Sequence, residues 1–252
     1  MHRILMSVVL CVACTVLAAV SLAAPADADV PFVKMYTEEG MFLIALFPDL
    51  APHHSANFTY LAETGFFDET AFHRIIPGFV IQGGDPNSKD RDPRNDGQGG
   101  PSLADVLTED EQQQLAAAGE ILEAKGYAGL SLDTRANLKA EFSVTTKHLR
   151  GTMSMARARS HDSAGSQFFV CVDATPQLDR QYTVFGHVVT GMEAVDRIVS
   201  APTDPSKGQD YPAEPVRIVR CELLTGVAHL SADEQIAYRE MIEFLKAEGS
   251  SW

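Results

Sequence analysis

Residues 72–85 read FHRIIPGFVIQGGD, a run apolar enough for a buried strand except at Pro77, Gly78 and Gln82, with Arg74 near its start. Side chains alternate between the two faces of a strand. The even spacing of Arg74 and Gln82 therefore puts both on one face, provided that the bend at Pro77 and Gly78 leaves the count intact. Together with nearby aromatic residues, the pattern predicts a mainly hydrophobic pocket with a few directional hydrogen-bonding groups. Such a pocket suits a compact apolar group flanked by peptide carbonyls.

Further strand-like runs lie on both sides of this segment. Residues 32–36 and 41–47 are joined by TEEG and predict a β-hairpin with Gly40 in its turn. The other runs are GTMSMA, SQFFVCVD, YTVFGHVV and VRIVRCELL, at residues 151–156, 166–173, 182–189 and 216–224. Many short strands joined by turns that carry Gly and Pro predict an all-β barrel or sandwich with helical caps.

Helical patterns are confined to four places. Residues 51–67 have helical spacing and end near Gly65, and residues 191–199 form a second short helix. Within residues 102–138, TEDEQQQLAAAGEILEAKG starts with Thr108 and Glu111 as a capping box, which predicts a helical insertion packed outside the barrel. The tail, residues 227–252, predicts a last helix that begins with the capping box Ser231 and Glu234 and has an apolar face at Ile236, Met241, Ile242 and Leu245.

The first 26 residues have the layout of an export signal. A basic start at Arg3 precedes uncharged residues from Ile4 to Ala26, with small residues where a signal peptidase cuts. The apolar stretch is nearly long enough to span a bilayer, so an uncleaved anchor is an alternative, and lipid attachment at Cys14 is a weaker one. The sequence therefore predicts an exported protein of the periplasm or a secretory compartment, whose only route to a membrane is this segment.

The chain is acidic, with 20 Lys and Arg against 34 Asp and Glu and a formal charge of −14. Without the first 26 residues, which hold Arg3 and no acid, the balance is 19 − 34 = −15. A surface this acidic repels phosphate backbones, which argues against nucleic acid as a general partner. Cys171 and Cys221 lie in apolar strand-like sequence, which favours buried free thiols, although the spacing leaves a disulfide open.

Three other kinds of site were weighed and are not favoured. A serine hydrolase triad from His161, Asp162, Ser163 and Ser166 fails because neighbours in sequence do not form a triad by adjacency and no G-x-S-x-G elbow exists. The acidic loop at residues 85–97 lacks the spacing and the closing glutamate of a calcium loop. The adjacent His53 and His54 do not converge on one metal ion.

The segments FHRIIPGFVIQGGD, GTMSMA, GSQFFV and VFGHVVTGMEAVDRI, in this order, closely resemble the cyclophilin family of peptidyl-prolyl cis/trans isomerases. The resemblance covers residues 30–226 apart from the insertion. It implies an eight-stranded antiparallel barrel capped by two helices, with a proline-binding groove on its outer surface. The implied activity needs no cofactor and no metal, and its partners are proline-containing segments of unfolded or folding proteins.

The resemblance also implies a role for each matching position. Arg74 matches the catalytic arginine, and Phe79, Val80, Phe169 and Leu178 match the apolar pocket for the proline ring. Gln82 and Gln167 match polar groove residues, whereas Ala156 and Arg157 match the edge that pairs with the substrate backbone. Because adjacent strand residues face opposite ways, Phe168 is expected in the core, and His73 is expected to be structural.

Four positions depart from the family pattern. Gln177 replaces a tryptophan that the resemblance associates with tight cyclosporin binding, so weak inhibition by that drug is expected. Tyr182 stands in place of a groove histidine and keeps a flat apolar face and one hydrogen-bonding group. Arg157 and Arg159 replace a small Asn/Gly loop, and their charge predicts a preference for acidic segments beside the proline.

The sequence thus predicts an exported prolyl isomerase that accelerates the folding of secreted proteins. X-Pro isomerisation takes tens to hundreds of seconds without a catalyst, which is slow enough to limit folding. The alternative is a non-catalytic proline-peptide binding module or holdase chaperone that uses the same groove. Arg74 and the two pocket phenylalanines favour the enzyme, while the changes at Gln177 and Arg157 keep the alternative open.

Overall fold

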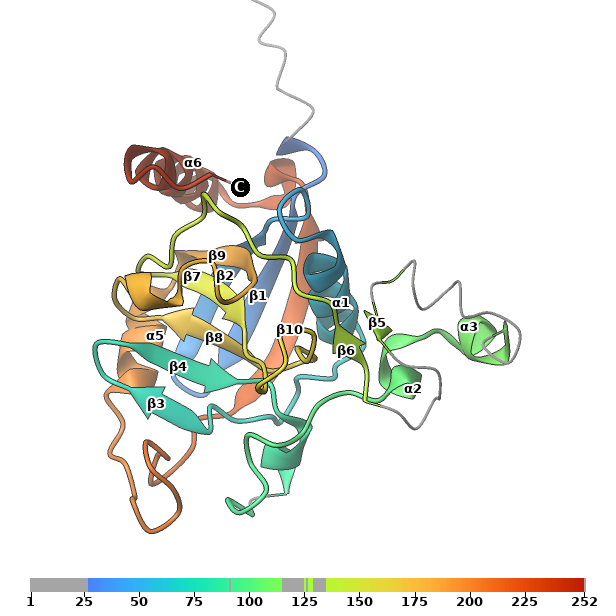
Figure 1. Ribbon diagram of the computed structural model, residues 1–252. Helices are drawn as coiled ribbons and strands as arrows, with labels where there is room; N and C mark the ends of the chain where they lie inside the picture. Colours follow the sequence, from blue (N-terminus) through green and yellow to red (C-terminus); the bar gives the residue numbers. More distant parts are fainter. Residues whose placement is uncertain (1–26, 91, 115–124, 126, 129–134, 252) are drawn as a thin grey trace, which may run out of the picture.

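The computed structural model describes residues 27–90, 92–114, 125, 127–128 and 135–251 (Figure 1). Eight antiparallel strands form one curled sheet in the order β10-β1-β2-β9-β7-β8-β4-β3. Their bounds are β1 Pro31–Thr37, β2 Gly40–Leu46, β3 Arg74–Ile76, β4 Val80–Gly83, β7 Thr152–Met155, β8 Phe168–Cys171, β9 Val184–Thr190 and β10 Ile218–Thr225. The predicted mainly β, eight-stranded antiparallel fold is confirmed.

Backbone hydrogen bonds just before β3 and β10 join the two edges of this sheet. Phe72 N donates to Val216 O at 2.9 Å, and Ile218 N donates to Thr70 O at 2.8 Å. These bonds satisfy backbone groups that an open edge would leave without partners. The sheet therefore wraps around a core of apolar side chains, as predicted for a barrel.

The two predicted capping helices are α1, Pro52–Glu63, and α5, Met192–Val199. Pro52 stands at the start of α1, where its missing N–H costs nothing. Each helix turns an apolar stripe into the core, with Phe58 fully buried in α1 and Val195 in α5. Gly191, which precedes α5, has φ +88 and leaves no room for a side chain, because a Cβ there would lie 2.3 Å from Met41 O.

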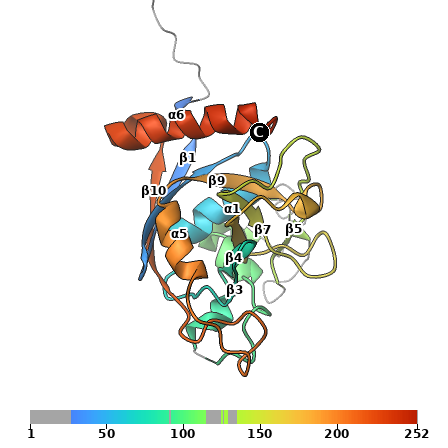
Figure 2. The ribbon, with the colours of Figure 1, turned by 90° about the vertical axis from the view of Figure 1, so that its left-hand side faces the viewer.

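Strand β2 is buried on both faces, which explains its unbroken apolar sequence. Phe42 and Ile44 point into the barrel core, whereas Leu43 and Ala45 belong to a second cluster on the outer face. The C-terminal helix α6, Ala232–Ala247, covers this second cluster. Figure 2 shows α6 lying across the end of the sheet that is far from β3 and β4.

Helix α6 confirms the predicted tail helix but changes its apolar face. The predicted capping box is present, with Glu234 N donating to Ser231 Oγ at 3.3 Å. Tyr238, Met241 and Leu245 are buried, whereas Ile236 is 52% exposed and was wrongly placed on the packed face. The buried positions follow the i, i+3, i+7 spacing that one helical face requires.

Replacing Leu245 with alanine is therefore expected to lower the free energy of unfolding by about 2 to 5 kcal/mol, because it opens a cavity under α6. Ile236→Ala on the exposed face of the same helix is the matched control and should change stability by less than about 0.5 kcal/mol. Urea unfolding of the two variants measures the difference. Equal effects would show that α6 does not pack as described.

The insertion differs from its prediction. The structure has two short helices, α2 Leu103–Val106 and α3 Glu109–Gln114, and a two-stranded ladder of β5 Tyr127–Ala128 with β6 Asn137–Leu138. The predicted helix continues from residue 115 to 126, of which only residue 125 is described. The capping box is present, since Thr108 N donates to Glu111 Oε2 at 2.9 Å.

Both ends of the insertion belong to the main core, which was not predicted. Leu103, Val106 and Leu138 are buried in the same cluster as Phe58 of α1. Removing residues 102–138 would expose this part of the core, so the segment is more than an external decoration. The described part of the chain also contains the single-turn helices η2 Pro86–Lys89, η3 Pro176–Leu178 and η4 Val227–His229.

Candidate active site

Residues 72–85 contain a hairpin formed by β3 and β4, with Gly78 in the turn at φ +71. Arg74 and Gln82 are direct cross-strand partners in this hairpin, while the adjacent Ile75 and Ile81 point into the core. The bend at Pro77 and Gly78, on which the prediction of a shared face was conditional, is the turn between the two strands. The two polar side chains still share one face, because paired residues on neighbouring strands point the same way.

Beside this hairpin lies a cavity of about 170 Å³ on the outside of the barrel. Its lining contains nine of the ten residues predicted for the site, namely Arg74, Phe79, Val80, Gln82, Ala156, Arg157, Phe169, Leu178 and Tyr182. Phe168 points the other way into the core, as expected from strand alternation. Residues from β3, β4, β8 and two loops thus meet around one cavity that is lined by both apolar and polar side chains.

Gln167, the tenth predicted residue, lies next to this cavity and fixes the amide of Gln82. Gln82 Nε2 donates to Gln167 Oε1 at 3.0 Å, and Gln167 Nε2 donates to Gly99 O at 2.9 Å and to Asp85 Oδ2 at 3.3 Å. The buried Asp85 carboxylate also accepts Gly99 N at 3.0 Å. Because the carboxylate only accepts, it orients both amides and leaves Gln82 Oε1 as the acceptor that faces the cavity.

Arg74 stands at the mouth of the cavity with 41% of its side chain exposed. Arg74 Nε lies 3.7 Å from Asp210 Oδ2. The Asp210 backbone carbonyl accepts Ile75 N at 2.9 Å, so the loop that carries Asp210 is attached to β3. The contact with Asp210 was not predicted, because 136 positions of chain separate this residue from Arg74.

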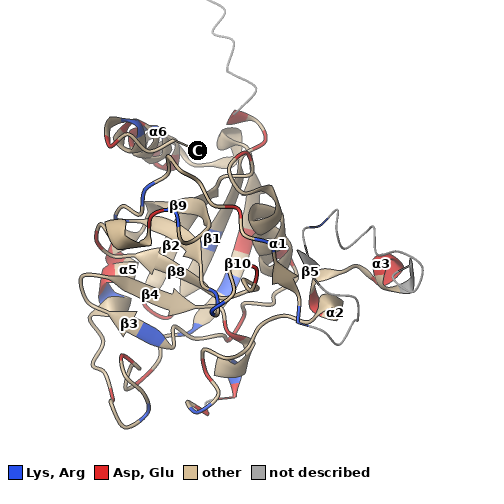
Figure 3. Cartoon of the chain, in the orientation of Figure 1, with Lys and Arg blue, Asp and Glu red and all other residues tan. Residues whose placement is uncertain are grey.

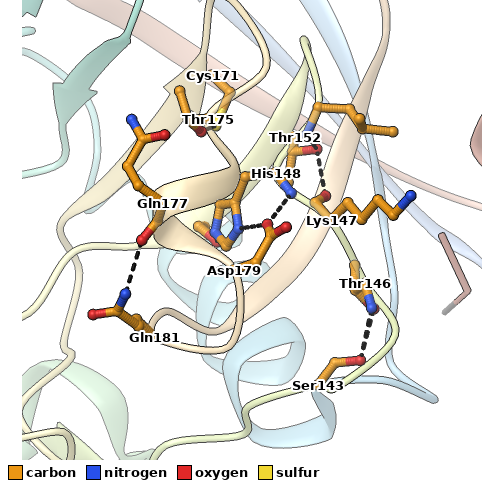
Figure 4. Close-up of polar contacts among 12 residues, drawn as sticks. Ser143, Thr146, Lys147, His148, Thr152, Cys171, Thr175, Gln177, Asp179 and Gln181 are labelled. Carbon is orange, nitrogen blue, oxygen red and sulfur yellow. Dashed lines mark hydrogen bonds and ion pairs between the residues drawn. The ribbon is translucent and has the colours of Figure 1, made fainter. Parts of the chain in front are cut away.

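A buried histidine, His148, contacts Asp179 close to the cavity wall (Figure 4). His148 Nδ1 lies 2.9 Å from Asp179 Oδ1, and its Nε2 lies 2.9 Å from Ser154 Oγ. Its ring stacks on Phe169, with 6.0 Å between centroids. Burial lowers the pKa of His148, although the hydrogen bond and charge of Asp179 act to raise it.

This Asp–His–Ser arrangement does not form a hydrolytic site, because Ser154 is fully buried and beyond the reach of a substrate. A neutral imidazole donates from Nδ1 to Asp179 and accepts the Ser154 hydroxyl at Nε2. Asp179 follows Leu178 in the chain, so its bond to His148 also holds one wall of the cavity. The role of the set is to position Phe169 and Leu178.

Arg157 and Tyr182 form the rim opposite the hairpin. The Arg157 guanidinium lies 4.6 Å above the Tyr182 ring, and Tyr182 meets Phe169 edge to face at 5.5 Å. Arg157 Nε and Nη2 donate to Gln181 O at 3.2 and 3.0 Å, and Nη1 donates to Ala158 O at 3.1 Å. Arg159 is exposed and lies outside the lining of this cavity.

The other candidate sites do not assemble in the structure. Ser166 Oγ donates to Gly84 O at 2.7 Å, and Ser163 Oγ donates to Ser160 O at 2.6 Å, so neither hydroxyl faces a histidine. His54 Nδ1 lies 2.6 Å from Glu141 Oε2, a pair that holds α1 to the loop after β6. Among the residues that the structure describes, no group of three His, Cys, Asp or Glu side chains is placed to hold a metal ion.

Both cysteines of the described chain are free thiols, as the sequence favoured. Cys171 is on β8, next to the cavity, and Cys221 is on β10, which is an edge strand separated from β8 by four other strands. Burial raises the pKa of each thiol to about 12. Neither cysteine is therefore a nucleophile at neutral pH.

Comparisons with known proteins agree with this geometry. Residues 32–223 match the family model "Cyclophilin type peptidyl-prolyl cis-trans isomerase/CLD". The chain belongs to the cyclophilin family. As a cyclophilin-type peptidyl-prolyl cis-trans isomerase, it is an enzyme that acts on proline-containing peptides.

Individual relatives support the assignment. The cyclophilin domain is 35% identical over 193 residues to peptidyl-prolyl cis-trans isomerase-like 1 of Neurospora crassa, a match that covers 76% of this chain and 93% of the relative. It is 35% identical over 191 residues to peptidyl-prolyl cis-trans isomerase 9 of Schizosaccharomyces pombe, where the match covers 75% of this chain but only 25% of that longer protein.

A solved structure gives the same fold. The crystal structure of a Cryptosporidium parvum cyclophilin type peptidyl-prolyl cis-trans isomerase, determined in the presence of the dipeptide Ala-Pro, superimposes with a TM-score of 0.58 at 27% identity. The superposition covers 77% of this chain and 98% of that chain.

The rim of this cyclophilin predicts weak cyclosporin binding. Gln177, at the position where the resemblance expects tryptophan, is exposed, and its backbone carbonyl accepts Gln181 Nε2 at 2.8 Å. Without an indole the rim lacks both its flat apolar surface and its N–H donor. We expect inhibition only above micromolar drug concentrations, with Gln177→Trp at least about tenfold more sensitive. Submicromolar inhibition of the unmodified protein would contradict this account.

Proposed function

We propose that this cyclophilin accelerates X-Pro isomerisation during the folding of exported proteins, with Arg74 as its catalytic residue. The observation that carries the proposal is the pairing of Arg74 and Gln82 beside the apolar side chains of one cavity. Phe79, Val80, Phe169 and Leu178 supply the surface for a proline ring. The Arg74 guanidinium and the Gln82 amide oxygen supply directional hydrogen-bonding groups at one side of that ring.

The residue types suit a rotation that makes and breaks no covalent bond. The barrier of about 18 to 20 kcal/mol comes from the partial double-bond character of the peptide C–N bond. In the twisted transition state the nitrogen becomes pyramidal and gains a lone pair that the planar substrate lacks. A guanidinium N–H aimed at that nitrogen therefore stabilises the transition state more than the substrate, which is the condition for catalysis.

The loop after β7 is the proposed edge for the substrate backbone. Ala156 N already donates to Gln167 O at 2.9 Å, so the substrate has to pair with the other backbone groups of Ala156 and Arg157. This internal bond also ties the edge to the residue that orients Gln82. Backbone pairing at this edge would hold the peptide in register while the prolyl bond turns.

The export context rests on the sequence of residues 1–26, which lie outside the described residues. In the part of the chain that the structure describes, none of the helices is both long and apolar enough to cross a bilayer. N-terminal sequencing of the protein recovered from a producing cell tests the proposal. A mature chain that starts near residue 27 supports export, and a cytosolic chain that retains Met1 or Arg3 contradicts it.

Refolding of a secreted protein with a proline-limited slow phase tests the activity. Catalytic amounts of the enzyme should speed the slow phase, with a rate that rises in proportion to enzyme concentration. A protein that suppresses aggregation without changing this rate would instead be the holdase of the alternative hypothesis. The two outcomes are separable because aggregation and the slow phase are recorded in the same sample by scattering and fluorescence.

A further inference from the structure

A second, smaller cavity of about 100 Å³ adjoins the proline cavity. The two share Gln82, Ala156 and Arg157 in their linings, so a peptide in the first has neighbouring residues at the second. Four glycines, at positions 97, 99, 100 and 165, form part of the remaining wall and leave the space open. The cavity has room for a short side chain of the substrate.

The charge of this cavity is opposite to that of the protein. Both charged residues in its lining are arginines, Arg157 and Arg135, in a chain with 34 acidic and 20 basic residues. Acidic residues, by contrast, are spread over α2, α3 and α5 (Figure 3). The Asp85 carboxylate lies behind Gln167 and is occupied by the Gly99 N–H and by the Gln167 amide.

Each arginine is held at the cavity by the backbone. Arg135, from the end of the insertion, donates from Nη2 to Gln98 O. The aliphatic part of its side chain packs on Gly100, because a Cβ at position 100 would lie only 3.4 Å from Arg135 Cδ. Arg157 uses three of its five N–H groups on Gln181 O and Ala158 O. Within the described chain, no carboxylate forms an ion pair with either guanidinium, and two N–H groups of Arg157 have no partner.

We propose that this second cavity binds the carboxylate of an Asp or Glu side chain within three residues of the substrate proline. The inference rests on the proposed function, because the proline cavity sets the position of the peptide. Arg135 and Arg157 make charge-assisted hydrogen bonds to the carboxylate, which are stronger than neutral ones. Arg159, which the sequence suggested as the second positive charge, is replaced in this role by Arg135 of the insertion.

Peptides with Glu or the isosteric Gln at each of the three positions on either side of an Ala-Pro bond test the proposal. Two-dimensional NMR exchange gives kcat/KM, and titration in the same samples gives Kd. At one position we expect kcat/KM for the Glu peptide to be about fivefold higher than kcat/KM for the Gln peptide in low salt. This ratio should fall toward one in 0.5 M NaCl.

Arg135→Gln should reduce this Glu/Gln ratio. Arg135→Glu should make a Lys peptide a better substrate than the Glu peptide. Arg159→Gln makes the same change in net charge outside the cavity and is the matched control, which should keep the ratio. Equal values for Glu and Gln peptides at every position would overturn the proposal, as would equal effects of Arg159→Gln and Arg135→Gln. If Gln peptides are bound but not isomerised, the proposed function fails, and the Kd ratio still decides the inference.

Discussion

Arg74→Ala is expected to lower kcat/KM for an Ala-Pro peptide about 100-fold or more. Removing one preoriented donor to a developing charge or lone pair typically costs a factor of about 100 to 1,000, and a 100-fold loss corresponds to about 2.7 kcal/mol of transition-state stabilisation. Arg74 is partly exposed and its side chain does not fill the core, so the fold should remain. Turnover is measured with a protease-free peptide assay.

Two variants make this result specific. Arg74→Lys keeps the positive charge but loses the planar fork, so it should recover only part of the activity. Arg94→Ala removes the same charge from an exposed side chain that pairs with Asp92, and it should leave turnover unchanged. If Arg74→Ala retained a third or more of the activity, another group would have to stabilise the transition state.

Acidification is expected to weaken the fold through His187. The side chain is buried on β9, where Nδ1 lies 2.8 Å from Val188 O, and burial lowers its pKa from 6.5 to about 4. Between these values the unfolded chain binds a proton that the native protein does not, so stability falls as pH falls from about 6.5 to about 4. The shift corresponds to about 3 kcal/mol of unfolding free energy. Burial also lowers the pKa of His73 and of His148, which acts in the same direction.

Urea unfolding at several pH values from 7.5 to 4 measures this effect, with His187→Gln as the control. Glutamine keeps a donor but does not titrate, so the variant should lose stability less steeply on acidification than the unmodified protein. Carboxylates contribute equally to both proteins and cancel in the difference. The same pH dependence in both would show that His187 is not responsible.

The sequence predicted the strands and most of the site because the necessary signals are local. Strand alternation separated Phe168 from Phe169, and the hairpin at Gly40 and both capping helices lie where the pattern placed them. The shared face of Arg74 and Gln82 was predicted from their even spacing, on the condition that the bend at Pro77 and Gly78 left the count intact. Their even spacing agreed with one strand, but the turn at Gly78 makes them partners across two.

What the sequence did not reveal depends on contacts between distant segments. Asp85 orients Gln82 through Gln167, a residue 82 positions away from Asp85, and no spacing rule predicts such a contact. Asp179 lies 31 positions from His148, so the set behind Phe169 also appears only in the folded chain. In the insertion, good helix formers predicted an external helix, but propensity does not report that Leu103 and Leu138 complete the core.

The most direct test of the mechanism is NMR exchange spectroscopy of an Ala-Pro peptide bound to the unmodified protein and to Arg74→Ala. The peptide is titrated so that its affinity and the rate of cis/trans exchange on the protein are obtained separately. Differential stabilisation of the transition state predicts that Arg74→Ala binds the peptide within a few-fold of the unmodified protein but exchanges it at least about 100-fold more slowly. Exchange in the variant as fast as in the unmodified protein would contradict the role of Arg74, and binding without acceleration in the unmodified protein would contradict catalysis in this groove.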